Sequence, residues 1–227
     1  MNNLTLIIPA KNEAESLPTV LNDLSNLNCN ITVSLDKNDH ATIDSIKKFN
    51  IDIYKQKELG YGNSLIEAIN NCKTEYFCIF NADGSFEKDD LNEMLKLNYQ
   101  NDFVFTSRYL KNAGSDDDTI VTYVGNKFFS TLGRILFSLK INDILYTYVM
   151  GKTQSFRMLN LKSGDFRFCV ELPIKIQILG LKYASLASFE KKRLGGKKKV
   201  NAIKDGLLIL LEMLRLFFIC KILKKKN

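Results

Sequence analysis

Short apolar runs alternate with stretches of helical periodicity over the first half of the chain, and this rhythm limits the fold more than any other feature. The run Leu4–Ile8 ends at Pro9, and the helical stripe that follows consists of Leu17, Val20, Leu21, Leu24 and Leu27. Continuous apolar strands are typical of a sheet buried on both faces, and strands that alternate with helices favour parallel pairing through crossover connections. The sequence therefore predicts an α/β fold with a mostly parallel mixed sheet flanked by helices.

The same patterns predict the individual elements. We expect strands at 4–8, 31–35, 51–54, 76–80, 103–107 and 183–189, and helices at 17–27, 42–49, 64–72, 128–139, 166–179 and 205–223. Ser16 is the expected N-cap of the first helix, and Pro173 is expected to interrupt the helix at 166–179. The small, acidic segment 112–118 is expected to be a mobile surface loop.

Length and cysteine usage limit the class of protein. A chain of 227 residues can fill one good-sized core with an appended segment, so we expect one domain over 1–200 and a tail over 201–227. The five cysteines are scattered without a CxxC pair, so neither a disulfide framework nor a zinc site is indicated. No cationic and apolar signal segment opens the sequence, and we expect a protein of the reducing cytoplasm.

Positive charge is concentrated late in the chain. The net charge is +7, and the basic runs lie at 190–199 and 221–226. Such runs suit a nucleotide, a phospholipid surface or nucleic acid, although Lys224–Lys226 could also be a solvated tail. Nucleic acid is disfavoured, because the runs are not interleaved with aromatic residues and no nucleic-acid motif is present.

The last segment, 205–223, is apolar except for a few charges. Glu212 and Arg215 lie in its middle, where charges are costly inside a bilayer, so we expect an amphipathic, basic helix in the membrane interface rather than a spanning one. A helix docked on the domain or on a second subunit explains the pattern almost as well.

A polar turn follows the apolar strand at 76–80. It carries Asn81, Asp83 and Ser85, whose oxygens would suit a hard cation that bridges a pyrophosphate. Ligands of open α/β sheets bind beyond the carboxyl ends of the strands, where this turn would lie. The same residue types are common in tight turns, so the turn alone is weak support.

Six segments in order carry a family resemblance that reaches from the first strand to about residue 200. They are 7–13, 36–42, 60–62, 81–83, 107–109 and 193–199. On these segments the chain resembles a family 2 glycosyltransferase with the GT-A nucleotide-sugar-binding fold, closest to the dolichol-phosphate mannose synthase-like branch. The resemblance implies inverting, metal-assisted sugar transfer from a nucleotide diphosphate donor, with Mg²⁺ or Mn²⁺.

The resemblance also implies roles for particular residues. Those that line the nucleotide sugar would be Pro9, Lys11, Glu13, Asp36, Asn81, Ala82, Asp83, Arg193 and Lys199. The metal would be held by Asp83, with Asn81 in place of the family's usual first aspartate and Ser85 as a further oxygen. Other interpretations stay open, because Glu13 could be a carboxylate at a helix start and Asp36 a turn-forming residue.

The acceptor side is expected around Asp143 and Arg108. By the resemblance Asp143 is the acceptor-side carboxylate, which could take a proton from a hydroxyl acceptor, and Arg108 would bind phosphate oxygens. A phosphate acceptor is already anionic and would need cations more than a base; Arg108, Lys127 and Arg134 could supply them.

The acceptor would be a polyprenyl phosphate or a glycan, in surface polysaccharide or glycan assembly. We expect the enzyme on the cytoplasmic face of an anionic membrane, and a homo-oligomer is left open. The alternatives are a non-catalytic nucleotide-sugar-binding or membrane-scaffold protein and, ranked last, a sugar nucleotidyltransferase, because Pro9–Glu13 is not a glycine-rich phosphate loop.

Overall fold

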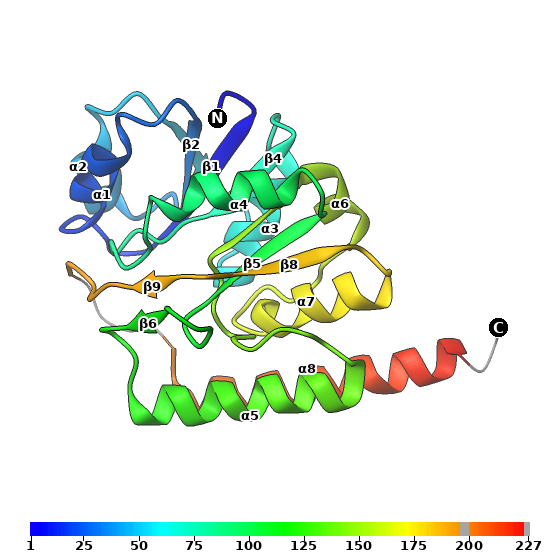
Figure 1. Cartoon of the computed structure of the whole chain (residues 1–227). Coiled ribbons are helices and arrows are strands. Elements are labelled where there is room, and N and C mark those ends of the chain that lie inside the picture. Colours follow the sequence, from blue (N-terminus) through cyan, green and yellow to red (C-terminus); the bar gives the residue numbers. More distant parts are fainter. Residues whose placement is uncertain (196–199, 225–227) are drawn as a thin grey trace.

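A mixed sheet of seven strands forms the centre of the computed structural model, which describes residues 1–195 and 200–224, and side chains only as far as residue 220 (Figure 1). The strand order is β3-β2-β1-β4-β7-β5-β8. The strands are β1 (Leu4–Ala10), β2 (Asn30–Leu35), β3 (Asp52–Lys55), β4 (Tyr76–Ile79), β5 (Phe103–Ser107), β7 (Val149–Lys152) and β8 (Tyr183–Ala187). All neighbouring pairs are parallel except those of β7, which is antiparallel to both β4 and β5. The predicted mostly parallel mixed sheet is therefore confirmed.

Helices cover both faces of this sheet. They are α1 (Leu17–Leu24), α2 (His40–Ile46), α3 (Tyr61–Asn71), α4 (Asp90–Asn98), α5 (Ile120–Phe137), α6 (Thr153–Met158), α7 (Phe168–Ile178) and α8 (Ala202–Lys224). Successive side chains of β1 point to opposite faces, so Leu6 and Ile8 pack in a cluster with α1 and α4, whereas Ile7 packs in a cluster with α3, α5, α7 and α8. The core is thus divided by the sheet into two parts.

Four elements that the sequence analysis did not predict are β6 (Gly114–Ser115), β7, α4 and α6. β7 contains Gly151, a residue that strands disfavour, yet a Cβ at this glycine would lie 2.6 Å from the Phe103 ring. Close packing against the neighbouring strand therefore explains the glycine. The short segments of α4 and α6 bury few apolar residues, so their periodicity was too weak to indicate a helix.

One local prediction is confirmed in position only, and another is wrong. Ser16 stands at the N-cap position of α1 but makes no capping bond with its side chain; its hydroxyl donates instead to Glu13 Oε2 at 2.8 Å. Pro173 lies inside α7 without ending it, because the residues around it are buried and hold the helix together.

The acidic segment before α5 is tied down by main-chain bonds. It contains the short strand β6 (Gly114–Ser115), which pairs in parallel with β9 (Phe189–Glu190). Thr119 then caps α5 by accepting from the backbone N–H of Thr122, so the helix begins eight residues before the predicted start at Phe128. These contacts position the loop 112–118 beside the end of β8.

The C-terminal helix α8 docks on α5 and α7 (Figure 1). Ile209, Met213 and Leu216 are buried in the same cluster as the sheet residues, and Glu212 is buried with Arg215 as its partner. The inner face of α8 is therefore docked on the domain, as the alternative interpretation of this segment expected. Its role at a membrane interface stays a prediction. No helix in the described part of the chain is long and apolar enough to cross a membrane.

Candidate functional site

The carboxyl ends of β1, β2 and β4 meet at one edge of the sheet. Because β1 pairs in parallel with both β2 and β4, the segments that leave these strands are neighbours. They bring Glu13, Asp36 and the turn 81–85 to the same edge, as expected for a ligand crevice in an open α/β sheet.

The turn after β4 is built around Asp83. The Oδ1 atom of Asp83 accepts from the backbone N–H of Ser85 at 3.0 Å, and Gly84 has a φ of +79°, which favours glycine. Asn81 Nδ2 donates to Ser85 Oγ at 3.3 Å, so the three polar side chains form one connected group. Asp83 and Ser85 are buried, at 9% and 1% exposure, while Asn81 is partly exposed.

A distant segment lies along this turn. The backbone N–H of Leu194 donates to the Asp83 carbonyl and that of Lys191 to the Ser85 carbonyl, each at 2.8 Å. The side chain of Leu194 covers Gly84, where a Cβ would lie only 2.6 Å from it. These contacts bring the predicted basic segment to the predicted metal turn, although they are more than a hundred residues apart in the sequence.

Arg193 joins two carboxylates at this point. Its Nη1 atom lies 3.5 Å from Asp83 Oδ2, and its Nη2 atom lies 3.1 Å from Asp117 Oδ2. Burial alone would lower the pKa of Arg193, but the hydrogen bonds that it donates to Asp117 and the charge of Asp83 raise the pKa above its usual value. The guanidinium therefore stays protonated and positively charged. Its predicted partner in phosphate binding, Lys199, lies outside the described residues.

The turn offers a hard, oxygen-rich donor set for a metal. Asp83 provides one carboxylate, Asn81 an amide and Ser85 a hydroxyl, and no group of three or more His, Cys, Asp or Glu side chains in the described chain could hold a metal by itself. Oxygen ligands of this kind fit Mg²⁺ or Mn²⁺ when a diphosphate supplies further oxygens. The contact with Arg193 shows that a positive charge is already accommodated beside Asp83.

The remaining predicted nucleotide residues are near the ends of β1 and β2. Glu13 is buried, accepts from Ser16 and donates its own N–H to Thr42 Oγ1 at 3.0 Å. Lys11 is exposed, and Pro9 lies opposite Ser34 in the register of β1 and β2. Asp36 Oδ1 accepts from the N–H of Asn38 at 2.9 Å, the bond of a turn-forming aspartate, so both interpretations of Asp36 stay open.

Arg108 and Asp143 form a buried pair beyond the end of β5. Asp143 Oδ2 accepts from the backbone N–H and the Nε of Arg108, both at 2.9 Å, and Oδ1 accepts from Nη2 at 2.8 Å and from Asn126 Nδ2. The side chains are 10% and 0% exposed. Burial alone would lower the pKa of Arg108, but its bonds to Asp143 and the charges of Asp143 and Glu190 raise it well above the usual value. Both oxygens of Asp143 are thus occupied by donors.

Sequence reasoning did not single out three residues of this region, which are Asp117, Asn126 and Glu190. Glu190 accepts from Arg108 Nη1 at 2.9 Å and from the Ser115 hydroxyl, and so joins β9 to the pair. The sequence analysis recognised the segment 112–118 as small and acidic and assigned it no partner. The structure divides it, because Asp118 lies 4.0 Å from Arg108 whereas Asp117 binds Arg193. Acidic composition was the available signal, but the choice of partner depends on the fold.

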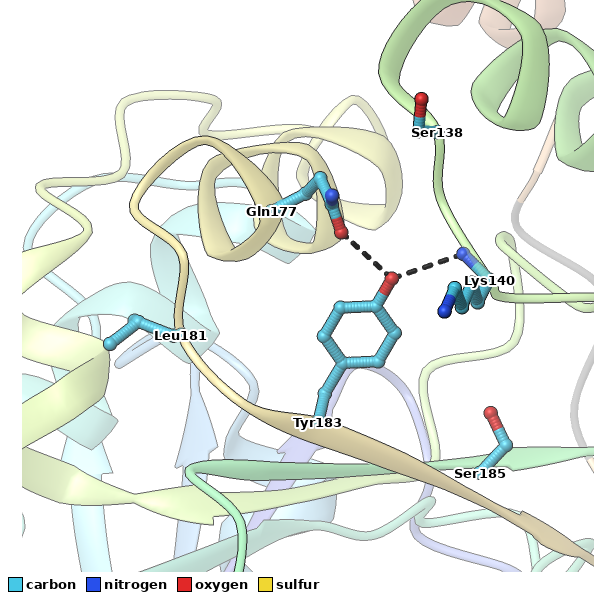
Figure 2. Close-up of a pocket in the computed structure, with 6 residues that line it drawn as sticks. All are labelled: Ser138, Lys140, Gln177, Leu181, Tyr183 and Ser185. Carbon is cyan, nitrogen blue, oxygen red and sulfur yellow. Dashed lines mark hydrogen bonds between the residues drawn. The ribbon is translucent and has the colours of Figure 1, made fainter.

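A hollow of about 490 Å³ opens at the start of β8, away from these strand ends (Figure 2). In Figure 2 the Tyr183 hydroxyl lies between Gln177 and the backbone of Lys140; it donates to Gln177 Oε1 at 2.9 Å and accepts from Lys140 N at 3.0 Å. The Tyr183 hydroxyl is thus already bonded on both sides, and the hollow lies away from the residues that carry the family resemblance.

Comparison with known proteins agrees with this geometry. The family model for glycosyl transferase family 2 matches residues 5–163, from β1 through β7 and α6. Comparison with the curated proteins gave no match.

Several solved structures share the fold at low sequence identity. Glucosyl-3-phosphoglycerate synthase from Mycobacterium tuberculosis, solved with Mn²⁺, UDP and glucosyl-3-phosphoglycerate, has a TM-score of 0.73 and 11% identity over 95% of this chain and 80% of that one. Mannosyl-3-phosphoglycerate synthase from Rubrobacter xylanophilus has a TM-score of 0.67 and 15% identity over 99% and 74% of the chains. S. aureus TarS in complex with UDP-GlcNAc has a TM-score of 0.58 and 15% identity over 93% and 66%. These likenesses establish the GT-A fold.

Proposed function

The chain belongs to glycosyl transferase family 2 and is a nucleotide-sugar-dependent glycosyltransferase, and we propose that it transfers a sugar with inversion from a nucleotide diphosphate donor to a polyprenyl phosphate or a glycan. The observation that carries this proposal is the meeting of Asp83 and Arg193 beyond the end of β4. A carboxylate and a guanidinium side by side can bind a diphosphate and its metal ion together. The carboxylate would bind the metal, and the guanidinium would bind the phosphate oxygens.

The donor would bind along the ends of β1, β2 and β4. Pro9, Lys11, Glu13 and Asp36 would line the nucleoside, in the roles that the family resemblance implies, and Ala82 would lie against the sugar or diphosphate. Mg²⁺ or Mn²⁺, held by Asp83 with Asn81 and Ser85, would supply positive charge for the diphosphate. The complexes of the structural neighbours with Mn²⁺ or Mg²⁺ and UDP support this choice of metal and donor class.

The main requirement of the reaction is to stabilise the negative charge that develops on the departing nucleotide. As the bond from the sugar to the diphosphate breaks, negative charge grows on the diphosphate oxygens. Arg193, and Lys199 from the same basic segment, would stabilise that charge. Asp117 holds Arg193 from the opposite side and keeps the guanidinium beside the turn.

The surroundings of Asp143 favour a phosphate over a hydroxyl as the acceptor. A hydroxyl acceptor needs a base, and both oxygens of Asp143 already accept hydrogen bonds from Arg108 and Asn126. A phosphate acceptor is anionic near neutral pH and can attack without losing a proton. With such an acceptor, Asp143 would position Arg108, and Lys127 and Arg134 on α5 would attract the phosphate.

The proposal includes the finer expectations from the sequence. They are a place in the dolichol-phosphate mannose synthase-like branch, a role in surface polysaccharide or glycan assembly, and a peripheral position on the cytoplasmic face of an anionic membrane. The basic segments near the C-terminus support the last of these.

The test is a transfer assay with purified protein, Mn²⁺, radiolabelled UDP-, GDP- and dTDP-sugars and polyprenyl phosphate. Label that enters the organic phase only when metal is present would identify the donor and establish the lipid-phosphate acceptor. Asp83→Asn should lower this activity roughly a hundredfold or more, the scale of losing one electrostatic group in an active site. EDTA should abolish it.

Asp89→Asn is the control, because Asp89 is an exposed carboxylate six residues further along the chain and makes no cap bond with its side chain. It should keep full activity. Released nucleotide without label in the lipid would move the acceptor to a glycan. A folded protein that turns over no nucleotide sugar would overturn the proposal and favour a binding or scaffold protein.

A further inference from the structure

Helices α5 and α8 lie side by side and run in the same direction (Figure 1). Gly206 faces Phe129, Gly133 faces Met213, and the rings of Phe137 and Phe217 are 6.1 Å apart, so contacts advance together along both helices. Ile209, Met213 and Leu216 point inward from α8, and Phe129, Gly133 and Phe137 from α5. The two helices therefore form one layer with a common outer face.

That outer face is apolar along its whole length. On α8 the stripe Ile203, Leu207, Leu211, Leu214 and Phe218 advances by three or four residues at each step, and its side chains are 37–86% exposed. On α5 the stripe Ile120, Val121, Val124, Phe128 and Ile135 is 53–84% exposed. Single exposed apolar residues are ordinary, but ten on two adjoining helices make a continuous patch of the kind that marks an interaction surface. We call these ten residues the outer stripe.

The exposed charges that the structure describes on α5 and α8 are basic. The only charged side chains of α5 are Lys127 and Arg134, and both are exposed. On α8, Lys204 and Arg215 are exposed, whereas Glu212 is buried and pairs with Arg215 at 2.6 Å and Asp205 is half-buried. No fully exposed carboxylate therefore lies on either helix among the side chains that the structure describes. The sequence adds Lys221 and Lys224–Lys226 beyond them.

An apolar stripe bordered by cations matches an anionic lipid surface. Acyl chains accept the apolar side chains while the basic ones meet lipid phosphates. A second copy of the chain is a poorer match, because pairing two outer stripes would bring like charges together.

The outer stripe begins next to the candidate site. α5 starts at Ile120, separated from Asp117 and Asp118 only by its N-cap Thr119, and Asp117 holds Arg193 at the Asp83 turn. On the same helix Asn126 bonds Asp143, and the ammonium of Lys127 lies 5.2 Å from the centre of the Tyr109 ring, next to Arg108. A phosphate held at the lipid surface would therefore arrive near the acceptor side.

We propose that the outer stripe of α5 and α8 docks the protein on an anionic lipid bilayer, with both helices lying in the interface. With this docking the membrane contact includes α5 as well as the C-terminal tail. The bilayer would then lie beside the acceptor side of the site, around Asp143 and Arg108. The docking itself is independent of sugar transfer. Only the delivery of a lipid-phosphate acceptor rests on the proposed function.

Sedimentation with vesicles tests the docking without any nucleotide sugar. The full chain is mixed with vesicles of phosphatidylcholine alone or with added phosphatidylglycerol. Binding to the anionic vesicles should exceed binding to neutral ones by roughly tenfold or more and should fall with added salt. The α5 variant Val124→Ser/Phe128→Ser/Ile135→Ser should lose roughly tenfold in binding, as should Leu207→Ser/Leu211→Ser on α8.

The control variant is Leu59→Ser/Met158→Ser, which removes equally exposed apolar side chains away from both helices and should bind as the unchanged protein does. If the anionic vesicles do not bind the protein, or if the α5 variant binds them unchanged because the basic tail alone is responsible, the proposal is overturned. It is also overturned if the protein is a dimer in analytical ultracentrifugation that the α5 variant dissociates, since the face would then belong to a second copy.

Discussion

Two Asp–Arg pairs in this chain have similar bonds and different surroundings. Asp143 and Arg108 are joined by several bonds and are almost fully buried, whereas Asp165 and Arg167 are joined at 2.8 Å with side chains 40% and 38% exposed. Removing one partner of a buried pair leaves an uncompensated charge, while an exposed charge returns to water. We therefore expect the contribution of each pair to the stability of the fold to depend on its burial rather than on its bond lengths.

Asp143→Asn should lower the free energy of unfolding by about 3 kcal/mol, the low end for breaking a buried pair, because Arg108 would lose the charged partner of three of its bonds but keep Glu190 as a counter-charge. Asp165→Asn, the matched control, should cost about 1 kcal/mol or less. Urea unfolding followed by circular dichroism measures both. Equal losses in the two variants would show that the pair at Asp143 is not buried as the structure has it.

At the scale of elements, glycines decide how closely a helix approaches its neighbours. A Cβ at Gly62 in the first turn of α3 would lie 2.0 Å from the carbonyl oxygen of Ser163, which is backbone and cannot rotate away. A Cβ at Gly125 in α5 would meet nothing within 4 Å. The glycine pair at 60–62, one of the segments of the family resemblance, thus allows α3 to pack on the segment 163–165.

The same substitution should have opposite effects in these two helices. Gly62→Ala should lower the stability by about 1–3 kcal/mol or more through overpacking. Gly125→Ala should raise it by about 0.5–1 kcal/mol, because alanine favours a helix over glycine. Thermal unfolding of the two variants would check this. A stable Gly62→Ala protein would contradict the close contact between α3 and the 163–165 segment.

Elements with a strong local pattern were predictable and those defined by their neighbours were not. β1, β2 and β5 and the helices α1 and α3 have runs or stripes that are visible within one window of sequence. β7 could not be recognised, because it exists through antiparallel pairing with two strands that precede it by dozens of residues. The same distinction applies to the site. The turn at Asp83 was predictable from adjacent residues, but the pairing of Asp117 with Arg193 was not.

At the scale of the whole molecule, one apolar cluster joins the sheet to five helices, including the last. Met213 on α8 is fully buried in the cluster that also holds Ile7 of β1 and Phe168 of α7. The proposed boundary at residue 200 therefore separates the sequence motifs from the tail, but residues on both sides of it pack in the same cluster. The tail is part of the core on its inner side.

Met213→Ala should lower the free energy of unfolding by about 2–5 kcal/mol, the cost of a cavity in a closely packed core. Leu207→Ala, on the exposed side of the same helix, should change it by no more than about 0.5 kcal/mol. Chemical unfolding without lipid measures the difference. If both substitutions are equally mild, α8 does not dock on α5 and α7 in solution.

By itself the sequence determined the order of most strands and helices, the α/β class and the polar turn at 81–85, because these depend on residues that are close together in the chain. The tertiary structure alone decided which charges meet. Chain folding buried Asp143 with Arg108, placed Asp118 4.0 Å from the same guanidinium and brought Asp117 to Arg193. Local periodicity depends on neighbours in sequence, whereas the pairing of a charge depends on burial and on segments that meet only when the sheet has formed.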